Sequence, residues 1–518
     1  MKRAYWVFLF SVLALAHPAL GADTPKRGGR LVFAMEADVS TMNPFVRMLS
    51  TDQLMRSLFY ETLFDFDLKN NIVPALGQSW AISKNGLEYT VKLRPGVKFH
   101  NGQDVTAEDV KWSAEYAMDP KNGATGLSLM KAVESITVPD RHTVRFRLKE
   151  PTAPFLSTLA TIRGFVVVPK DSIARGADTL SGFPPGTGPF AFKEWKTGVQ
   201  LVLVRHQPYW QKGLPYLDEV VFKPIADATV RLSSLRAGDV DIIERAPSSF
   251  VSKIKKGELP GIRVAEASAA GFKRLIFNVQ KPPFDNRKLR EAVAFAIDKR
   301  QYLEAAFWGL GTPVDQRYPA GNPWFVKMPK MERDPAKAKA ALAEAGAGKD
   351  FEVELLGQQG DEAEQQILQQ QFASAGIKMK ITLLEYGTYR KKQRDRDFQM
   401  IIFGGRLQPD PHLVYGAEYT CAEAEQAKAR KGTRNLPGYC NEQVDKLLAE
   451  ASKITDRKKR FELYAKAIRQ IYEEVPEVPI AFYPRFYAHR DRVKGFVTSD
   501  TGDINSTKIG VLRTWIEK

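Results

Sequence analysis

The side chains that most often carry catalysis occur in this chain without the spacings that catalysis requires. The six histidines are spread along the sequence, and no His-Glu-x-x-His pair of metal ligands occurs. Neither a Gly-x-x-x-x-Gly-Lys-Ser/Thr phosphate loop nor a Gly-x-Ser-x-Gly nucleophile turn is present. Asp239 and Asp241 are close in sequence but lie where a strand is expected to begin, so a structural role is predicted for them. The pattern favours a binding protein over an enzyme.

A polar segment follows an apolar strand that is predicted over residues 398–403. It runs Gly404-Gly405-Arg406-Leu407-Gln408-Pro409-Asp410-Pro411-His412. Because ligands of open α/β sheets lie beyond the carboxyl ends of strands, this segment is a candidate ligand site. Phe403, Tyr415 and Tyr386 could stack on a ligand, although aromatic residues of this kind more often belong to a core.

The chain has two cysteines, Cys421 and Cys440. In an exported protein such a close pair suggests a disulfide that closes a surface loop. A loop of this size would stabilise the fold by roughly 3 kcal/mol in the loop-entropy model. Two buried free thiols are the alternative.

The elements that must position these residues are read from apolar periodicity. Alternating apolar residues predict strands, and a Thr106-Ala-Glu-Asp109 capping box predicts a helix start. A strand, a helix ended by Gly376 and a second strand together predict a βαβ unit with a parallel pair. The expected strands are 30–35, 87–93, 144–148, 351–356, 377–384 and 398–403, and the expected helices begin after Thr106 and span 335–345, 362–375 and 457–474. The fold class is therefore predicted to be mixed α/β.

Length and charge narrow the possibilities further. A chain of 518 residues exceeds what one core usually organises, so two or more lobes are expected. The formal net charge of +16 could suit nucleic acid, but the basic residues are scattered. The run Arg390–Arg394 is interpreted as a solvated face. No role in nucleic-acid binding is expected.

The N-terminus has the pattern of an export signal. Lys2 and Arg3 precede a short apolar run over residues 4–16, and Ala19-Leu20-Gly21 offers small residues for cleavage. The run is shorter than the ~20 residues that span a bilayer. We expect residues 1–21 to be removed after Gly21, leaving an exported periplasmic protein with a net charge of +14.

Short motifs along almost the whole mature chain resemble the extracellular solute-binding proteins of dipeptide, oligopeptide and nickel importers, family 5. The motifs are Ser40-Thr-Met-Asn-Pro44, Phe59-Tyr-Glu-Thr-Leu63, Gln78-Ser-Trp80, Tyr89–Gly102 (YTVKLRPGVKFHNG), Gly186-Thr-Gly-Pro-Phe190, Tyr209-Trp210, Leu235-Arg-Ala-Gly-Asp239, Phe277-Asn278, Pro282-Pro-Phe-Asp285 and Ala296-Ile-Asp298. Each motif alone is weak, but their order together is specific.

The resemblance implies a bilobal periplasmic-binding-protein fold of type II with two hinge crossings. Lobe I would span 22–270, with an extra subdomain near 65–180 and a C-terminal return over 485–518. Lobe II would span 271–484. The ligand would lie in the cleft, and closure of the lobes around it would shift the population towards the closed form.

The resemblance also implies ligand contacts after the strand at 398–403. In peptide binders of the family, a Trp and an Asp precede an acidic-Pro pair, and the Asp pairs with the α-ammonium group of the ligand. Aligning Asp410-Pro411 places Gly404 at the Trp position and Leu407 at the Asp position, so both expected residues are absent. A buried ammonium without a carboxylate partner is costly, and Arg406 has the wrong sign. We therefore expect a ligand that is neutral or anionic at this point; a shifted register, with another carboxylate serving the amine, is the alternative.

Two further residues acquire candidate roles from the family. In nickel-binding members an arginine that corresponds to Arg163 holds carboxylates of the metal-carrying ligand, and a guanidinium suits that contact. A structural salt bridge would explain Arg163 equally well. His412 occupies the position of a metal-contacting histidine, but the same Asp-Pro-His tripeptide occurs in members with other ligands. The predicted ligand-binding set is Arg163, Phe403, Gly405, Arg406, Leu407, Gln408, Asp410 and Tyr415, with no metal site and no cofactor assigned.

The implied function is that of a periplasmic receptor of an ABC importer. It would be a monomer that captures a peptide or peptide-like molecule and delivers it to inner-membrane permease subunits. A receptor for an opine, an oligosaccharide or a nickel chelate is the alternative. Less favoured are a sensor, a periplasmic chaperone and a hydrolase built on the same fold.

Overall fold

The computed structural model describes residues 24–46, 50–68, 70–124, 126–162, 165–173, 184–348, 350–405, 407–428, 434–499, 504 and 509–517. The expected signal peptide and its cleavage site, Arg163 and Arg406 lie outside the described residues. Within the described part of the chain, no helix is both long and apolar enough to cross a membrane.

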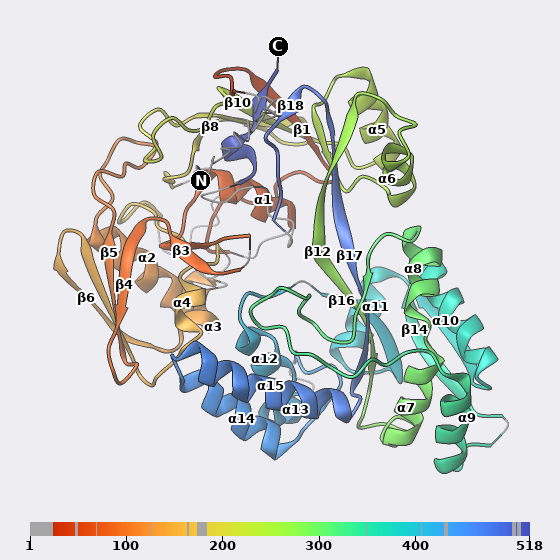
Figure 1. Cartoon of the computed structure of the whole chain (residues 1–518). Helices are drawn as coiled ribbons and strands as arrows, with labels where there is room; N and C mark the ends of the chain where they lie inside the picture. The colour runs from red at the N-terminus through yellow and green to blue at the C-terminus, as the bar shows by residue number, and fades with distance from the viewer. Residues whose placement is uncertain are drawn as a thin grey trace, which may run out of the picture.

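One large mixed sheet runs through most of the molecule (Figure 1). Its strands, in spatial order, are β15 (Lys378–Leu384), β14 (Glu352–Gln358), β16 (Met400–Gly405), β12 (Ile262–Phe277), β17 (Glu477–Arg490), β11 (Ile242–Glu244), β1 (Arg30–Met35), β10 (Glu219–Pro224), β9 (Gln200–Arg205) and β8 (Phe190–Lys196), with β13 (Thr312–Pro313) beside β17. The expected mixed α/β class is confirmed.

A second sheet is small and antiparallel. Its strands are β4 (Gly77–Ile82), β5 (Glu88–Leu93), β7 (Thr143–Leu148) and β6 (Val133–Asp140). Two short pairs join β2 (Phe64–Phe66) to β3 (Ile72–Pro74), and β18 (Val493–Lys494) to β19 (Trp515–Ile516).

Helices flank both sheets. Those of the first half are α1 (Ser50–Phe59), α2 (Ala107–Met118), α3 (Leu127–Met130), α4 (Phe155–Thr158), α5 (Ala228–Ala237) and α6 (Ser248–Lys255). Those of the second half are α7 (Arg287–Ala296), α8 (Lys299–Phe307), α9 (Pro335–Glu344), α10 (Glu362–Ser374), α11 (Tyr386–Arg394), α12 (Tyr415–Glu418), α13 (Cys421–Lys428), α14 (Glu442–Lys453) and α15 (Arg457–Glu473).

Three parts of the molecule have cores of their own. We call the part whose core residues lie between Leu31 and Ile242 and between Tyr487 and Ile516 the upper body. In its core, Phe33 of β1 packs against Phe222 of β10 and Tyr487 of β17. The small-sheet unit, whose core residues run from Leu63 to Val167, is formed around Tyr89. The lower body packs α7 to α10 and the α14–α15 pair around cores that lie between Leu275 and Ala481. Figure 1 shows these parts as separate masses of chain.

Strands β12 and β17 are the long elements that run from the upper to the lower body (Figure 1). They pair antiparallel, but their register breaks between Ala267 opposite Arg485 and Gly271 opposite Tyr483. A bulge of this kind bends a strand locally. The bend therefore lies where the chain passes from one body to the other.

The local predictions from periodicity are mostly confirmed. Strands β14 and β15 pair in parallel and are joined by α10, as expected for a βαβ unit. At the start of α2, the Thr106 amide donates to the Asp109 carboxylate, as expected for the capping box. Asp241 accepts from the Val32 amide and from Arg492, so its expected structural role is confirmed.

Several strand boundaries were predicted wrongly by one or two residues; β14, for example, is Glu352–Gln358 and not 351–356. Strand β16 begins at Met400 and continues to Gly405, whereas the glycines at 404 and 405 had suggested that it ends at Phe403. Gly404 and Gly405 stay in the ladder because they pair with Lys273 and Phe272 of β12. Pairing with a long neighbour outweighs the weak strand propensity of glycine.

Candidate functional site

The end of β16 and the chain after it form one wall of a pocket in the lower body. Phe403, Gly405, Leu407 and Gln408 all line this pocket, which has a volume of about 90 Å³. We call it the Leu407 pocket. The structure thus brings together the described members of the predicted set that lie in the 403–408 segment.

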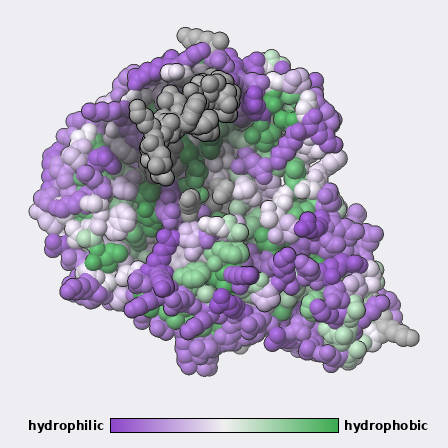
Figure 2. All heavy atoms as spheres, viewed as in Figure 1, coloured by the Kyte–Doolittle hydropathy of each residue, from purple (hydrophilic) through white to green (hydrophobic). Residues whose placement is uncertain are grey.

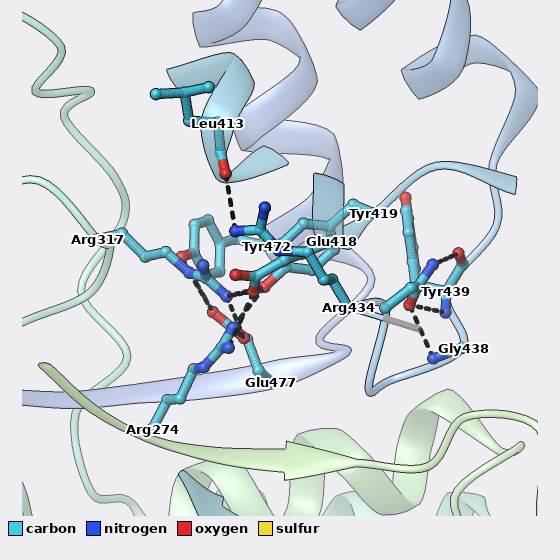
Figure 3. A network of polar contacts seen from close by, with 11 residues as sticks. Arg274, Arg317, Leu413, Glu418, Tyr419, Arg434, Gly438, Tyr439, Tyr472 and Glu477 are labelled. Atoms are coloured by element: carbon cyan, nitrogen blue, oxygen red, sulfur yellow. Dashed lines mark hydrogen bonds and ion pairs between the residues drawn. The ribbon is translucent and has the colours of Figure 1, made fainter. Parts of the chain in front are cut away.

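Arg274, Arg317 and Glu418 also line the pocket, and together with Glu477 they form a buried network of two arginines and two glutamates (Figure 3). Arg274 of β12 pairs with Glu477 and, at 2.9 Å, with Glu418. Arg317 lies 2.8 Å from Glu418 and 3.1 Å from Glu477, and it donates to the Tyr419 hydroxyl at 2.8 Å. The side chains of Arg274 and Glu477 are 3% and 0% exposed. Such a network is costly to open, because removing one partner leaves a buried charge unpaired.

Burial and charge act in opposite directions on these groups. Burial alone would lower the pKa of Arg317, but the adjacent carboxylates of Glu418 and Glu477 raise it well above its ordinary value. Burial raises the pKa of Glu477, and the positive charge of Arg317 opposes that rise. The positive charges of Arg274 and Arg317 are therefore balanced by the negative charges of Glu418 and Glu477.

A third arginine at the pocket has no such partner. Arg434 lines the Leu407 pocket, and its Nη2 donates to the Leu413 carbonyl at 3.2 Å. Within the described part of the chain, no carboxylate forms an ion pair with it. Figure 3 shows Arg434 extending towards the Leu413 carbonyl beside the network. Among the described residues that line the pocket, Arg434 therefore adds a positive charge that no carboxylate balances.

A disulfide closes the loop that supplies Arg434. Cys421 and Cys440 are bonded in the structure. Next to Arg434, the buried Asn435 amide donates to the Tyr439 and Thr420 carbonyls. The cross-link and these hydrogen bonds hold the end of the loop against the pocket.

Asp410 faces a different pocket. Its carboxylate accepts from the His412 amide at 2.9 Å and pairs with Arg460 at 2.6 Å, where both side chains are almost fully buried. Trp324 lies against this pair, with the Arg460 guanidinium 5.3 Å from its ring. The carboxylate of Asp410 is thus paired within the protein.

The remaining predicted residues lie in varied surroundings. Tyr415 is fully buried and lies beside Arg317, whose guanidinium is 5.8 Å from its ring. The His412 ring packs so closely over Gly416 that an added Cβ there would lie 2.6 Å from it. Tyr386 is 61% exposed. Among the described residues, no group of three or more His, Cys, Asp or Glu side chains could hold a metal ion.

The network residues were not found by reasoning from the sequence. Arg274, Arg317, Glu418, Arg434 and Glu477 come from distant parts of the chain, and no motif joins them. A signal was nevertheless present at two of these positions. Arg274 stands in the apolar run Leu275-Ile276-Phe277, and Glu477 stands among valines and prolines. A charged residue in a strand of this kind indicates a buried partner.

Comparison with known proteins agrees with this architecture. The family model "Bacterial extracellular solute-binding proteins, family 5 Middle" matches residues 71–425. The glutathione-binding protein GsiB of Escherichia coli O1:K1 / APEC is 29% identical over 497 residues, which cover 93% of this chain and 95% of that protein.

Two solved structures are similar at 28% identity, each with a TM-score of 0.77 and with coverage of 95% of this chain and 99% of theirs. One is the ABC transporter-associated periplasmic binding protein DppA from Helicobacter pylori in complex with the peptide STSA. The other is AgaA from A. tumefaciens R10 in complex with agropinic acid. The chain belongs to the bacterial extracellular solute-binding proteins of family 5, and it is a non-enzymatic substrate-binding protein of an ABC importer.

Proposed function

We propose that this protein is a periplasmic receptor that closes two lobes around a peptide or peptide-like molecule. The upper body and the small-sheet unit would form lobe I, over 22–270 and 485–518 with the subdomain near 65–180. The lower body would form lobe II, over 271–484. The register break in β12 and β17 at Gly271 and Arg485 supports a hinge at the expected crossings.

The observation that supports the ligand class best is the charge around the Leu407 pocket. Leu407 offers no partner to an ammonium group, and the nearby carboxylates of Glu418 and Glu477 are paired with Arg274 and Arg317. Arg434 adds a positive charge that can bind a carboxylate through charge-assisted hydrogen bonds. A carboxylate or neutral end of the ligand therefore suits this pocket better than a free amine.

The relatives support the same range of ligands. GsiB is named for glutathione, a peptide-like molecule, and the DppA structure holds a peptide. The AgaA structure holds agropinic acid instead, at the same identity to this chain. A non-peptide carboxylic acid of this type is therefore the second candidate ligand.

Native mass spectrometry of freshly purified protein would identify retained cargo. A thermal-shift panel would follow, with glutathione, agropinic acid, a nickel–histidine chelate, and a tripeptide in free, N-acetylated and C-amidated forms. A true ligand at a hundredfold excess over its Kd stabilises the fold by about 2.7 kcal/mol. We expect the N-acetylated tripeptide to stabilise at least as much as the free form, and C-amidation to remove the effect.

Arg434→Gln provides the test of the pocket. It should weaken binding of the C-terminal carboxylate by about tenfold or more, since a hydrogen bond to a charged group contributes about 1.5–3 kcal/mol. Lys458→Gln, the same charge change at an exposed position on α15, is the matched control. The proposal fails if the amidated peptide binds as well as the free acid, or if the protein turns its ligand over.

A further inference from the structure

A second pocket lies between the small-sheet unit and the lower body, with a volume of about 260 Å³. Phe66, Trp80 and Tyr89 line it from the small-sheet unit, and Trp324, Arg457 and Arg460 line it from the lower body. Figure 2 shows hydrophobic residues in the middle of this face of the molecule, inside a largely hydrophilic rim. We call this space the inter-body pocket.

The walls suit an aromatic ring. Four of the lining side chains named above are themselves aromatic, and aromatic pairs contribute about 0.5–1.5 kcal/mol beyond the area that they bury. A cavity of about 150 Å³ is large enough to hold benzene. The inter-body pocket therefore has room for one ring and a short polar substituent.

The charges suit an anionic substituent. Asp410 and Arg460 form an ion pair in the wall, so their charges cancel, although the buried Arg460 Nε has no hydrogen-bond partner among the described residues. Arg457 is exposed at the rim, where its guanidinium lies 5.7 Å from the Trp324 ring and donates to Asn71 Oδ1 at 3.2 Å. Within the described residues no carboxylate pairs with Arg457, so its remaining N–H groups can meet a carboxylate of a ligand.

The inter-body pocket exists only while the small-sheet unit and the lower body are in contact, because both supply its walls. The Ala153 amide donates to the Ser452 carbonyl at 2.7 Å, and Lys453 lies 3.3 Å from Glu150. With the Arg457–Asn71 hydrogen bond, these contacts join the small-sheet unit to α14 and α15. A ligand that contacts both walls therefore binds the form in which the small-sheet unit and the lower body touch, and not the form in which they are apart.

We propose that the inter-body pocket is a second binding site, which takes a small aromatic carboxylate and thereby stabilises the closed form. It is distinct from the Leu407 pocket, because the two pockets share no lining residue among those that the structure describes. The inference rests on the proposed closure of the lobes. By thermodynamic linkage, an occupant here raises the affinity of any ligand that also needs the closed form.

The site is tested on the full mature protein with 3-phenylpropionate, using its neutral amide 3-phenylpropanamide as a control. Titration calorimetry and the fluorescence of Trp80 and Trp324 should both report one saturable site. Arg457→Gln should weaken 3-phenylpropionate about tenfold and leave the amide nearly unchanged. The control variant is Lys458→Gln, which alters the adjacent exposed lysine and should have little effect. Absence of saturable binding, or equal losses in both variants, overturns the site.

A rim variant tests the link to closure. Lys453→Glu should weaken 3-phenylpropionate several-fold, because it places two acidic groups together across the rim, and Glu150→Lys in the same protein should restore binding. If the double variant stays as weak as Lys453→Glu, the link to closure is wrong.

Arg434→Gln separates this site from the Leu407 pocket. We expect 3-phenylpropionate to bind this variant normally, and a strong loss would place the probe in the Leu407 pocket and overturn the second site. If 3-phenylpropionate fails while Arg434→Gln still weakens carboxylate peptides, the second site is wrong and the proposed function stands.

Discussion

At the scale of single residues, we propose that Leu407 and the arginines around it decide which end of a ligand the pocket accepts. Leu407 lines the pocket, while Glu418 and Glu477 are paired with Arg274 and Arg317. Among the described residues, a free ammonium group would thus meet a positive excess and only carboxylates that are already paired. The selectivity that we propose follows from this imbalance of charge and not from the shape of the pocket.

Leu407→Asp should restore recognition of a free amine. The new carboxylate can accept charge-assisted hydrogen bonds from an ammonium group, which contribute about 1.5–3 kcal/mol. The preference for a free over an N-acetylated tripeptide should therefore increase by about tenfold or more, as measured by titration calorimetry. Leu407→Asn is the neutral control. Equal preferences in the Asp and Asn variants would show that position 407 does not face the end of the ligand.

A second residue, Glu61, should make the unfolding free energy depend on pH. Burial raises the pKa of Glu61 to about 7, although hydrogen bonds from Trp210 and Tyr209 to its carboxylate oppose the rise. A raised pKa means that the folded state binds more protons than the unfolded state between about pH 4.5 and pH 7. The contribution of Glu61 to stability is therefore complete at low pH and is lost as the pH rises through about 7.

Glu61→Gln should remove this dependence. Relative to the variant, the parent protein should lose up to about 3 kcal/mol of unfolding free energy between pH 4.5 and pH 8. Urea unfolding of both proteins across that range measures the difference, in which other titrating groups cancel. Glu258→Gln, at an exposed position, is the control and should follow the parent. A constant difference between parent and Glu61→Gln across the range would contradict the assignment.

At the scale of elements, β12 and β17 are the strands about which we propose that the upper and lower bodies move. The break in their register lies at Gly271, where an added Cβ would lie 2.0 Å from the ring of Tyr483. That ring is itself stacked on Phe307 at 5.2 Å, so it has little freedom to retreat. Gly271 therefore allows the two long strands to approach at the bend.

Gly271→Ala should lower the unfolding free energy by about 1–3 kcal/mol, the usual effect of overpacking. Gly405→Ala, in the same sheet, is the matched control, because an added Cβ there meets nothing within 4 Å. Chemical unfolding of the two variants measures the contrast. Similar losses in both variants would contradict a specific role for the contact with Tyr483.

Elements with strong local signals could be predicted from the sequence. The β14–α10–β15 unit and the capping box at Thr106 depend on short-range periodicity and on one side-chain contact, which the sequence displays directly. Strands β12 and β17 did not stand out in the same way. Pro479 and Pro484 interrupt the pattern of β17, and the pairing with β12 that accommodates them is a long-range contact. The ion network was missed for the same reason, since its members meet only in the folded chain.

At the scale of the whole molecule, the parts are connected in two places: by the long strands β12 and β17, and by contacts at the rim of the inter-body pocket. Strands β12 and β17 connect the upper body to the lower body, while the Ala153–Ser452 and Lys453–Glu150 contacts connect the small-sheet unit to the lower body. Among the described residues these rim contacts are few and partly exposed, and exposed ion pairs contribute only about 0–1 kcal/mol. In the proposed closure, the free energy that holds the closed form therefore comes mainly from the enclosed ligand.

Small-angle X-ray scattering on the mature protein tests this claim most directly. The ligand identified by native mass spectrometry would be removed by dialysis under mild denaturation, and the refolded protein would be measured before and after the ligand is added back. We predict that the radius of gyration falls on ligand addition, and that the fall saturates at one ligand per chain. An identical radius of gyration in both samples, with the ligand bound, would contradict capture by closure.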